Sequence, residues 1–215
     1  MKVDIFTDIK NIIDVDDLCK SNETISREII RKAIHFLIAF TPLLAAINKS
    51  FTVVFLIIGI LSYILMESMR FSGMKVPVVS LVTSIVSRLR DKNRFVMGPV
   101  TLGLGSLLAV LLFTPSAAAI AIYALAFGDG FASLVGRIAR LRPFFLYGKS
   151  IEGSLACFTA VFISAYVVSG SMHVSIAAAL TAMMTEALPL EDYDNLVLPV
   201  TVGMIVQLIE AVPKQ

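Results

Sequence analysis

Seven apolar runs recur along this chain of 215 residues, and they restrict its fold more than any other feature. They occupy residues 33–47, 51–66, 98–113, 117–127, 155–169, 174–188 and 196–211. Backbone polar groups in a bilayer must be satisfied within the segment, which favours helices. Most runs have about 15 or 16 residues, fewer than the roughly 20 that cross a bilayer core, so flanking residues must contribute or the membrane must thin. The sequence therefore predicts an all-α, polytopic membrane helix bundle with about seven transmembrane helices.

The composition excludes the main alternatives to a membrane protein. Hydrophobic residues make up 57% of the chain and charged residues 16%, against roughly 25% charged residues in a soluble domain. The mean hydropathy is +0.87. Cys19 and Cys157 are far apart and lack the spacing of a metal site. Neither a disulfide scaffold nor a zinc domain is therefore indicated.

Two segments outside the apolar runs have the pattern of interfacial amphipathic helices. Residues 5–18 and 76–90 each gather their aliphatic side chains on one helical face. Such helices lie at the membrane surface or pack on the bundle. We expect two parts of the chain: residues 1–26 as an N-terminal cytoplasmic amphipathic segment, and 27–215 as a membrane-embedded catalytic domain.

The positive charges are distributed unevenly between the two sides of the predicted bundle. Sixteen of the eighteen Lys and Arg residues fall within residues 1–32, 67–97, 128–154 and 189–195, which alternate spans place on one side. Only Lys49 and Lys214 fall on the other. By the positive-inside rule the charged side faces the cytoplasm. The prediction is an integral protein of a bacterial-type cytoplasmic (inner) membrane, with its active site facing the cytoplasm.

The segment GDGFASLVG, from Gly128 to Gly136, places a carboxylate at a membrane boundary. A charge there is costly unless it is solvated, paired or bound to a cation. Gly128 and Gly130 would let a ligand approach the backbone closely. Asp129 is thus a candidate ligand for Mg²⁺, and the alternative is an ordinary carboxylate at a helix end.

The segment YGKSIEGS, residues 147–154, precedes a predicted long helix. It combines Lys149 with the hydroxyls of Ser150 and Ser154, and a helix start favours anions. It is not a Walker A loop, because Pro143 stands where the first glycine is required. The segment is therefore a candidate phosphate-binding site of another kind.

Further polar residues lie at the same predicted ends of other spans. They are Arg31, Lys32, His35, Glu67, Arg70, Glu186, Asp194 and Asn195. Each has a simpler interpretation, as an orientation anchor, a hydrogen bond between helices or a local i,i+3 ion pair. In a bundle, however, they would bring acids able to hold Mg²⁺ and bases able to hold phosphates next to lipid. That combination points to a nucleotide-binding surface that serves a lipid.

At these residues the chain resembles the CTP-dependent lipid kinases, the family of dolichol kinase, phytol kinase and CTP-dependent diacylglycerol kinase. The resemblance covers about residues 27–210. Its motifs, in order, are RKxxH (Arg31, Lys32, His35), ExxR (Glu67, Arg70), GDxxASxxG (128–136), GKSxEGS (148–154) and E…DN…P (Glu186, Asp194, Asn195, Pro199). The long extra membrane region of dolichol kinases is missing, so the compact diacylglycerol or phytol kinases are more similar.

The resemblance implies transfer of the CTP γ-phosphate to a lipid alcohol with Mg²⁺ or another divalent cation. Asp129 would be an essential acid and metal ligand, Lys149 a triphosphate contact, and Arg31 and Lys32 further phosphate contacts. Glu67, Glu186 and Asp194 would be second choices as metal ligand or base, with His35, Arg70 and Asn195 as other site candidates. The implied nucleotide-binding residues are Gly128, Gly130, Ser133, Gly136, Gly148, Lys149, Ser150, Glu152, Gly153 and Ser154.

Two other functions compete with this interpretation. A phosphatidate cytidylyltransferase also uses CTP, Mg²⁺ and a lipid, but it releases pyrophosphate. A small transporter would carry charges inside its spans, whereas these charges lie at span ends.

The expected partners are CTP, a lipid substrate and the membrane, with no nucleic acid. The sequence leaves open the acceptor (diacylglycerol, phytol or polyprenol) and whether the protein forms a homo-oligomer.

Overall fold

The computed structural model describes residues 31–72, 95–139, 141, 149–190 and 192–212, and the regular structure within them is helical. After a helical stretch over residues 31–37, the elements are η1 (Ile38–Phe40), α3 (Thr41–Ile47), α4 (Lys49–Phe71), α6 (Gly98–Leu112), α7 (Pro115–Tyr123), η3 (Ala124–Gly128), α8 (Asp129–Ile138), α9 (Ile151–Ser169), α10 (Met172–Glu186) and α11 (Asp194–Glu210). The predicted all-α fold is confirmed for these residues. The amphipathic segments predicted over 5–18 and 76–90 lie outside them.

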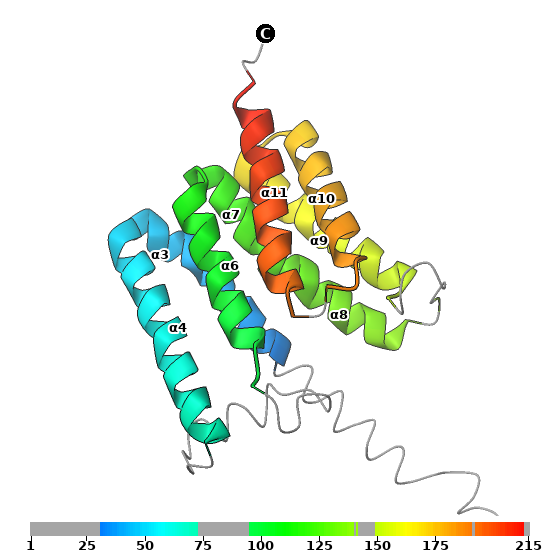
Figure 1. Ribbon diagram of the computed structural model, residues 1–215. Helices are drawn as coiled ribbons and strands as arrows, with labels where there is room; N and C mark the ends of the chain where they lie inside the picture. The colour runs from blue at the N-terminus through cyan, green and yellow to red at the C-terminus, as the bar shows by residue number, and fades with distance from the viewer. Residues whose placement is uncertain (1–30, 73–94, 140, 142–148, 191, 213–215) are drawn as a thin grey trace, which may run out of the picture.

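The helices form one bundle in which α4 is an outer member (Figure 1). α10 packs against α9 and α11, and α11 packs in turn against α6 and α7. α4 packs against α6 and α3. The tight connection between α3 and α4 is fixed by Asn48, whose side-chain oxygen accepts a hydrogen bond of 2.9 Å from the Phe51 amide. An N-cap of this kind satisfies an amide that the first helical turn leaves open.

Small side chains let the central helices approach closely. Ala117, Ala121, Ala178 and Ala182 are fully buried in the core. At the crossing of α6 and α11, a Cβ on Gly105 would lie 2.1 Å from the backbone oxygen of Asn195. Pro199 lies inside α11 and has no amide to donate to that oxygen, four residues before it. The sequence thus places glycine and proline where two backbones meet, as membrane helices do.

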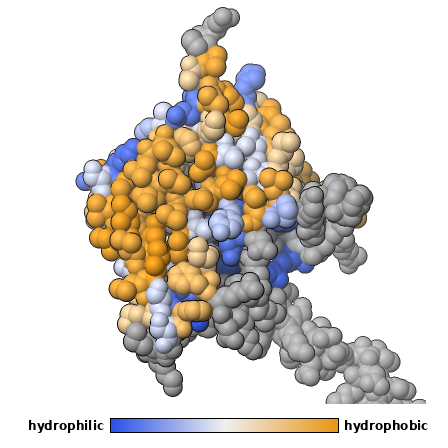
Figure 2. All heavy atoms as spheres, viewed as in Figure 1, coloured by the Kyte–Doolittle hydropathy of each residue, from blue (hydrophilic) through white to orange (hydrophobic). Residues whose placement is uncertain are grey.

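Large apolar side chains are exposed on the surface of the bundle. Within the part of the chain that the structure describes, three helical segments are long and apolar enough to cross a membrane: Lys49–Phe71, Pro115–Ile138 and Ile151–Ser169. Gly98–Leu112 is a shorter apolar helix. The outer face of α4 exposes Phe51, Phe55, Leu61 and Leu65, and Figure 2 shows apolar residues over most of the visible surface. A total of seven transmembrane helices remains a prediction.

The helical segment that contains the fourth apolar run extends beyond the end of that run. The run ends at residue 127, but the chain stays helical to Ile138 because η3, a π-helical turn, joins α7 to α8. The amide of Asp129 donates to the carbonyl of Ala124, five residues back. Asp129 therefore belongs to a continuous helical segment and does not end one. Single π-helical turns of this kind occur often at functional sites.

Candidate functional site

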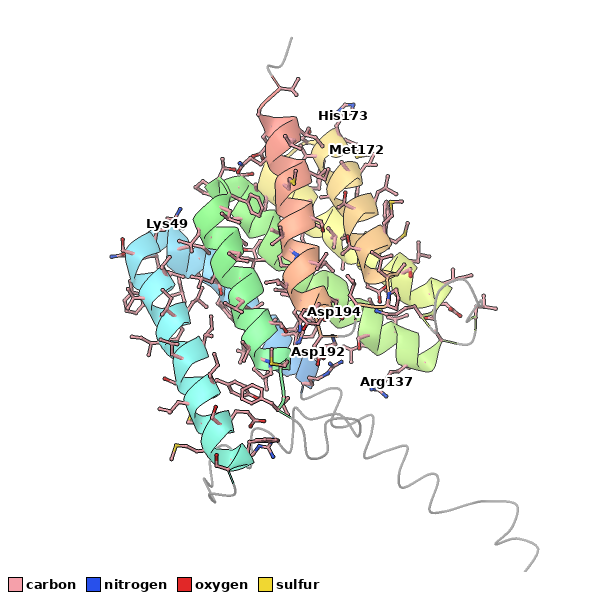
Figure 3. The ribbon with its side chains drawn as sticks, in the orientation of Figure 1. Lys49, Arg137, Met172, His173, Asp192 and Asp194 are labelled. Carbon is pink, nitrogen blue, oxygen red and sulfur yellow. The ribbon has the colours of Figure 1, made fainter. Side chains whose placement is uncertain are left out.

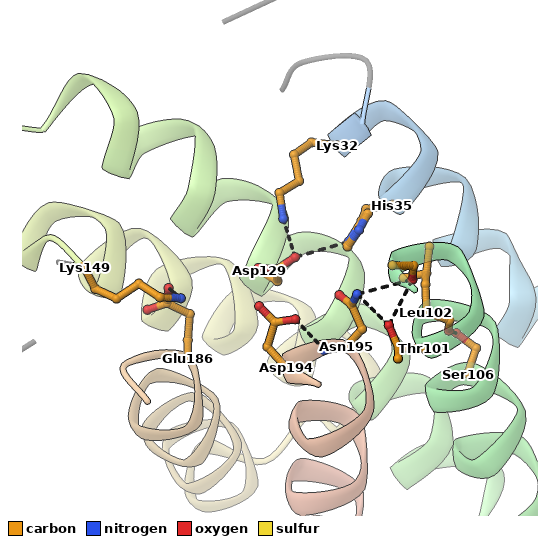
Figure 4. A network of polar contacts seen from close by, with 11 residues as sticks. Lys32, His35, Thr101, Leu102, Ser106, Asp129, Lys149, Glu186, Asp194 and Asn195 are labelled. Atoms are coloured by element: carbon orange, nitrogen blue, oxygen red, sulfur yellow. Dashed lines mark hydrogen bonds and ion pairs between the residues drawn. The ribbon is translucent and has the colours of Figure 1, made fainter. Parts of the chain in front are cut away.

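A buried cluster of charged and polar side chains lies where residues 31–37 meet the start of α8 (Figure 4). Asp129 is 6% exposed, Lys32 2% and His35 5%. The ammonium of Lys32 pairs with Oδ2 of Asp129, and Nδ1 of His35 lies 3.2 Å from the same oxygen. Buried charges persist only when they are paired or coordinated. The structure thus brings together three residues from two of the motifs, RKxxH and GDxxASxxG.

Aromatic packing holds the segment of residues 31–37 against α8. The ring of Phe36 lies 5.9 Å from that of Phe127 and 5.4 Å from that of Phe131, between centroids. A Cβ on Gly130 would lie 2.6 Å from the Phe36 ring. Gly130 is therefore needed for this contact between helices, which sets the position of Lys32 and His35 relative to Asp129.

A second ionic contact lies at the start of α9. Nζ of Lys149 is 2.7 Å from Oε1 of Glu186, the last residue of α10. The hydroxyl of Ser154 is 3.4 Å from the other oxygen of Glu186. Ser150 caps α9 by accepting a hydrogen bond of 3.0 Å from the Gly153 amide. The long helix predicted to follow residues 147–154 is present but begins earlier, at Ile151 inside that segment, and Gly148 lies outside the described residues.

Close packing of α8 on α9 explains the remaining glycines of the two motifs. A Cβ on Gly136 would lie 3.1 Å from the Ser150 hydroxyl oxygen, and one on Gly153 would lie 2.8 Å from the Ala132 carbonyl oxygen. A Cβ on Gly128 would lie 2.7 Å from a methyl group of Val161. These glycines thus bring the Asp129 and Lys149 segments together. Ser133 is half-buried on α8.

α11 contributes Asp194 and Asn195 at the same end of the bundle. Nδ2 of Asn195 lies 3.2 Å from the Thr101 hydroxyl and 3.4 Å from the Gly98 carbonyl oxygen. Asp194 accepts a 2.8 Å hydrogen bond from the Asn195 amide. In Figure 4 the carboxylate of Asp194 is directed toward Asp129. Asn195 therefore anchors α11 to α6 and helps to place Asp194.

Glu67 and Arg70 form a bidentate ion pair near the end of α4. Arg70 donates to both carboxylate oxygens of Glu67, over 2.6 and 2.7 Å. Oε1 of Glu67 also accepts a 3.0 Å hydrogen bond from the Val96 amide, and the Tyr63 hydroxyl donates to the Val96 carbonyl over 3.1 Å. The i,i+3 ion pair is confirmed. These contacts hold the chain entering α6 against the outer helix.

Two carboxylates at this end of the bundle, those of Asp129 and Asp194, could hold a divalent ion only together with other ligands. Within the described part of the chain, no group of three or more His, Cys, Asp or Glu side chains could hold a metal ion by itself. Mg²⁺, however, is often bound by only one or two carboxylates together with substrate phosphates and water. Asp129 and Asp194 offer carboxylate oxygens from two helices, and Glu186 is paired with Lys149. The roles of Asp129, Glu186 and Asp194 as metal ligands remain predictions.

Sequence reasoning did not find every contact at this end of the bundle. Thr101, the partner of Asn195, lies inside an apolar run. Its hydroxyl within that run was the one sequence feature that could have indicated a polar contact there. The Lys149–Glu186 pair joins residues that were predicted to bind different groups, a phosphate and a metal ion.

Comparisons with protein families, with characterised proteins and with solved structures give no match, so they assign the chain to no family.

Proposed function

We propose that this protein is a membrane-embedded lipid kinase that transfers the γ-phosphate of CTP to a lipid alcohol. The observation that carries the proposal is the buried Lys32–Asp129–His35 cluster, at the end of the bundle where Asp194 begins α11. Its residues come from two of the motifs on which the resemblance to the CTP-dependent lipid kinases rests. The contact of Lys149 with Glu186 brings residues from two further motifs together.

The chemistry of phosphoryl transfer suits such a site. The lipid hydroxyl oxygen would form a bond to the γ-phosphorus while the bond from that phosphorus to the β–γ bridging oxygen breaks and CDP leaves. The hydroxyl proton would pass to a carboxylate, for which Asp129 and Asp194 are candidates. Lys32 and Lys149 would neutralise phosphate charge, and Mg²⁺ held by Asp129 and Asp194 would neutralise more when bound. Positioning and electrostatics supply most of the catalysis in such reactions.

The location of the charged residues supports access from the cytosol. Arg137, Asp192 and Asp194 lie toward one end of the bundle, whereas Met172, His173 and Lys49 lie away from it (Figure 3). The topology predicted from the sequence assigns sixteen of the eighteen Lys and Arg residues to one side of the membrane. The positive-inside rule assigns that side to the cytoplasm, where CTP is found.

The purified protein in lipid nanodiscs would be given Mg²⁺ and CTP labelled at the γ-phosphate. Diacylglycerol, phytol, polyprenol and phosphatidate would be tested separately. Transfer of label to an alcohol supports the kinase and identifies its acceptor. Label released as pyrophosphate only with phosphatidate would replace the kinase by a cytidylyltransferase, which attacks at the α-phosphorus. A folded protein that neither transfers label to an alcohol nor releases it as pyrophosphate would contradict both.

A further inference from the structure

An apolar groove of about 500 Å³ runs between α8 and α9. Phe131 and Val135 line it from α8, and Ala156, Ala160 and Ile163 line it from α9, with Glu152 at one end. Both helices belong to segments of membrane-crossing length and hydropathy. In a helix that crosses the membrane such a groove would face hydrocarbon chains, and its volume is within the range of small-molecule sites.

The shape of the groove follows from its side chains. The small residues Ala156 and Ala160 leave a depression, while Leu155 and Ile163 stand out from the helix at 60% and 56% exposure. From Glu152 to Ile163 the groove follows α9 over about 16 Å, at 1.5 Å per residue. An extended hydrocarbon chain of a lipid fits a depression that is long and apolar in this way.

The charge at its polar end discriminates between kinds of lipid. Glu152 lies in the first turn of α9, three residues after Lys149 and two after Ser150. Oε1 of Glu152 accepts a hydrogen bond of 3.2 Å from the Leu141 amide, which fixes the carboxylate at the end of the groove. A carboxylate accepts a hydrogen bond from an alcohol but repels a phosphate headgroup. Charge complementarity therefore favours a neutral lipid alcohol over an anionic phospholipid.

We propose that this groove holds the hydrocarbon chain of the acceptor, a neutral lipid alcohol whose headgroup lies at Glu152. The proposal rests on the proposed kinase function and adds the location of its acceptor. It assigns Glu152 to the acceptor, whereas the motif placed this residue at the nucleotide. The nucleotide then lies on the Lys149 and Asp129 side of the α8–α9 contact.

The test uses photo-crosslinking to the full chain in phosphatidylcholine nanodiscs. Diacylglycerol and phytol, each carrying a diazirine in the hydrocarbon chain, are the probes, and mass spectrometry maps the labelled residues. The informative label is the part removed by excess unlabelled alcohol, because bulk lipid contact is not competed. We expect that label on the α8 and α9 residues of the groove, with competition by phosphatidate weaker by about tenfold.

Four substitutions, one of them a control, sharpen the test. Ala160→Phe fills the groove and should reduce the competed label about tenfold or more, whereas Ala46→Phe, at an exposed site on α3, should leave it unchanged. Ala156→Leu serves as a milder filling if Ala160→Phe does not fold. Glu152→Gln removes the charge and should let phosphatidate compete nearly as well as the alcohols.

Competed label outside the groove, no competed label at all, or equal competition by phosphatidate in the unmodified protein would overturn this inference. Transfer of the CTP γ-phosphate is measured on the same preparation. Transfer together with label elsewhere would reject the groove and keep the kinase. Competed label in the groove without transfer under any condition would reject the kinase and keep the lipid site.

Discussion

Lys32 and Asp129 form an ion pair across 97 positions of the sequence, and both side chains are almost completely buried. Removing Lys32 leaves the buried Asp129 carboxylate without its ammonium partner, with only His35 beside it. We expect Lys32→Met to lower the free energy of unfolding by about 3–5 kcal/mol. Adding Asp129→Asn to Lys32→Met should recover much of this loss, because neither charge then remains. Denaturant titration in detergent micelles measures both effects.

Lys49→Met is the matched control for this experiment, because Lys49 is exposed at the start of α4. It should change the free energy of unfolding by less than about 0.5 kcal/mol. If the losses from Lys32→Met and Asp129→Asn simply add in the double variant, the two residues are not coupled and the ion pair contributes nothing to stability.

Asp129→Asn should remove phosphoryl transfer, by roughly 10²–10⁴-fold, because an amide neither accepts the hydroxyl proton nor binds Mg²⁺ well. The rate of label transfer from CTP is the readout. Asp192→Asn, at a partly exposed site just before α11, should keep most of the activity. Near-normal, Mg²⁺-dependent turnover by a folded Asp129→Asn protein would exclude Asp129 as an essential metal ligand or base.

Lys149→Ala should weaken CTP binding by about 1.5–3 kcal/mol, the value of a charge-assisted hydrogen bond. This corresponds to a rise in Kd of roughly 10- to 150-fold. Glu186 would lose its partner in this variant, so Lys149→Ala is also combined with Glu186→Gln to separate binding from stability. Calorimetric titration with Mg²⁺ and CTP gives the affinity.

Arg137→Ala is the control for Lys149→Ala, since Arg137 is exposed in the last turn of α8. It should bind CTP with nearly the affinity of the unmodified protein. An unchanged Kd in both the Lys149→Ala and the double variant would remove Lys149 from the nucleotide site.

Gly105→Ala tests the close contact between α6 and α11. The new Cβ would lie 2.1 Å from the Asn195 carbonyl oxygen, which is backbone and cannot move aside easily. We expect a loss of about 1–3 kcal/mol from overpacking. Gly59→Ala, where nothing lies within 4 Å of the added methyl group, should instead be stabilising by about 0.5–1 kcal/mol. Equal thermal unfolding midpoints for the two variants would contradict a close contact between α6 and α11 at Gly105.

The helices could be predicted from the sequence because each apolar run requires one. The runs at 51–66 and 155–169 lie within α4 and α9. The runs at 174–188 and 196–211 lie in α10 and α11 except for their last one or two residues. Glu67 and Arg70 could be paired in advance because they are one helical turn apart. These predictions depend on local periodicity and composition, which the sequence expresses directly.

The long-range pairs could not be predicted in this way. The contacts of Lys32 with Asp129 and of Lys149 with Glu186 depend on how separate helices pack. The predicted approach of a ligand to Gly128 and Gly130 overlooked a second reason for glycine, the contacts with Val161 and Phe36. The π-helical turn before Asp129 has no hydropathy signal, since its residues are as apolar as those before it.

That turn fixes the rotation of α8 about the helix axis relative to α7 within the segment Pro115–Ile138. A π-helical turn holds one residue more than an α-helix needs, so removing one residue from Ala124–Gly128 would rotate α8 by about 100° relative to α7. Asp129 would turn away from Lys32, and Phe131 and Val135 would leave the groove on α9. A single additional residue thus sets the positions of the ionic cluster and of the α8–α9 groove together, and neither can be realigned without moving the other.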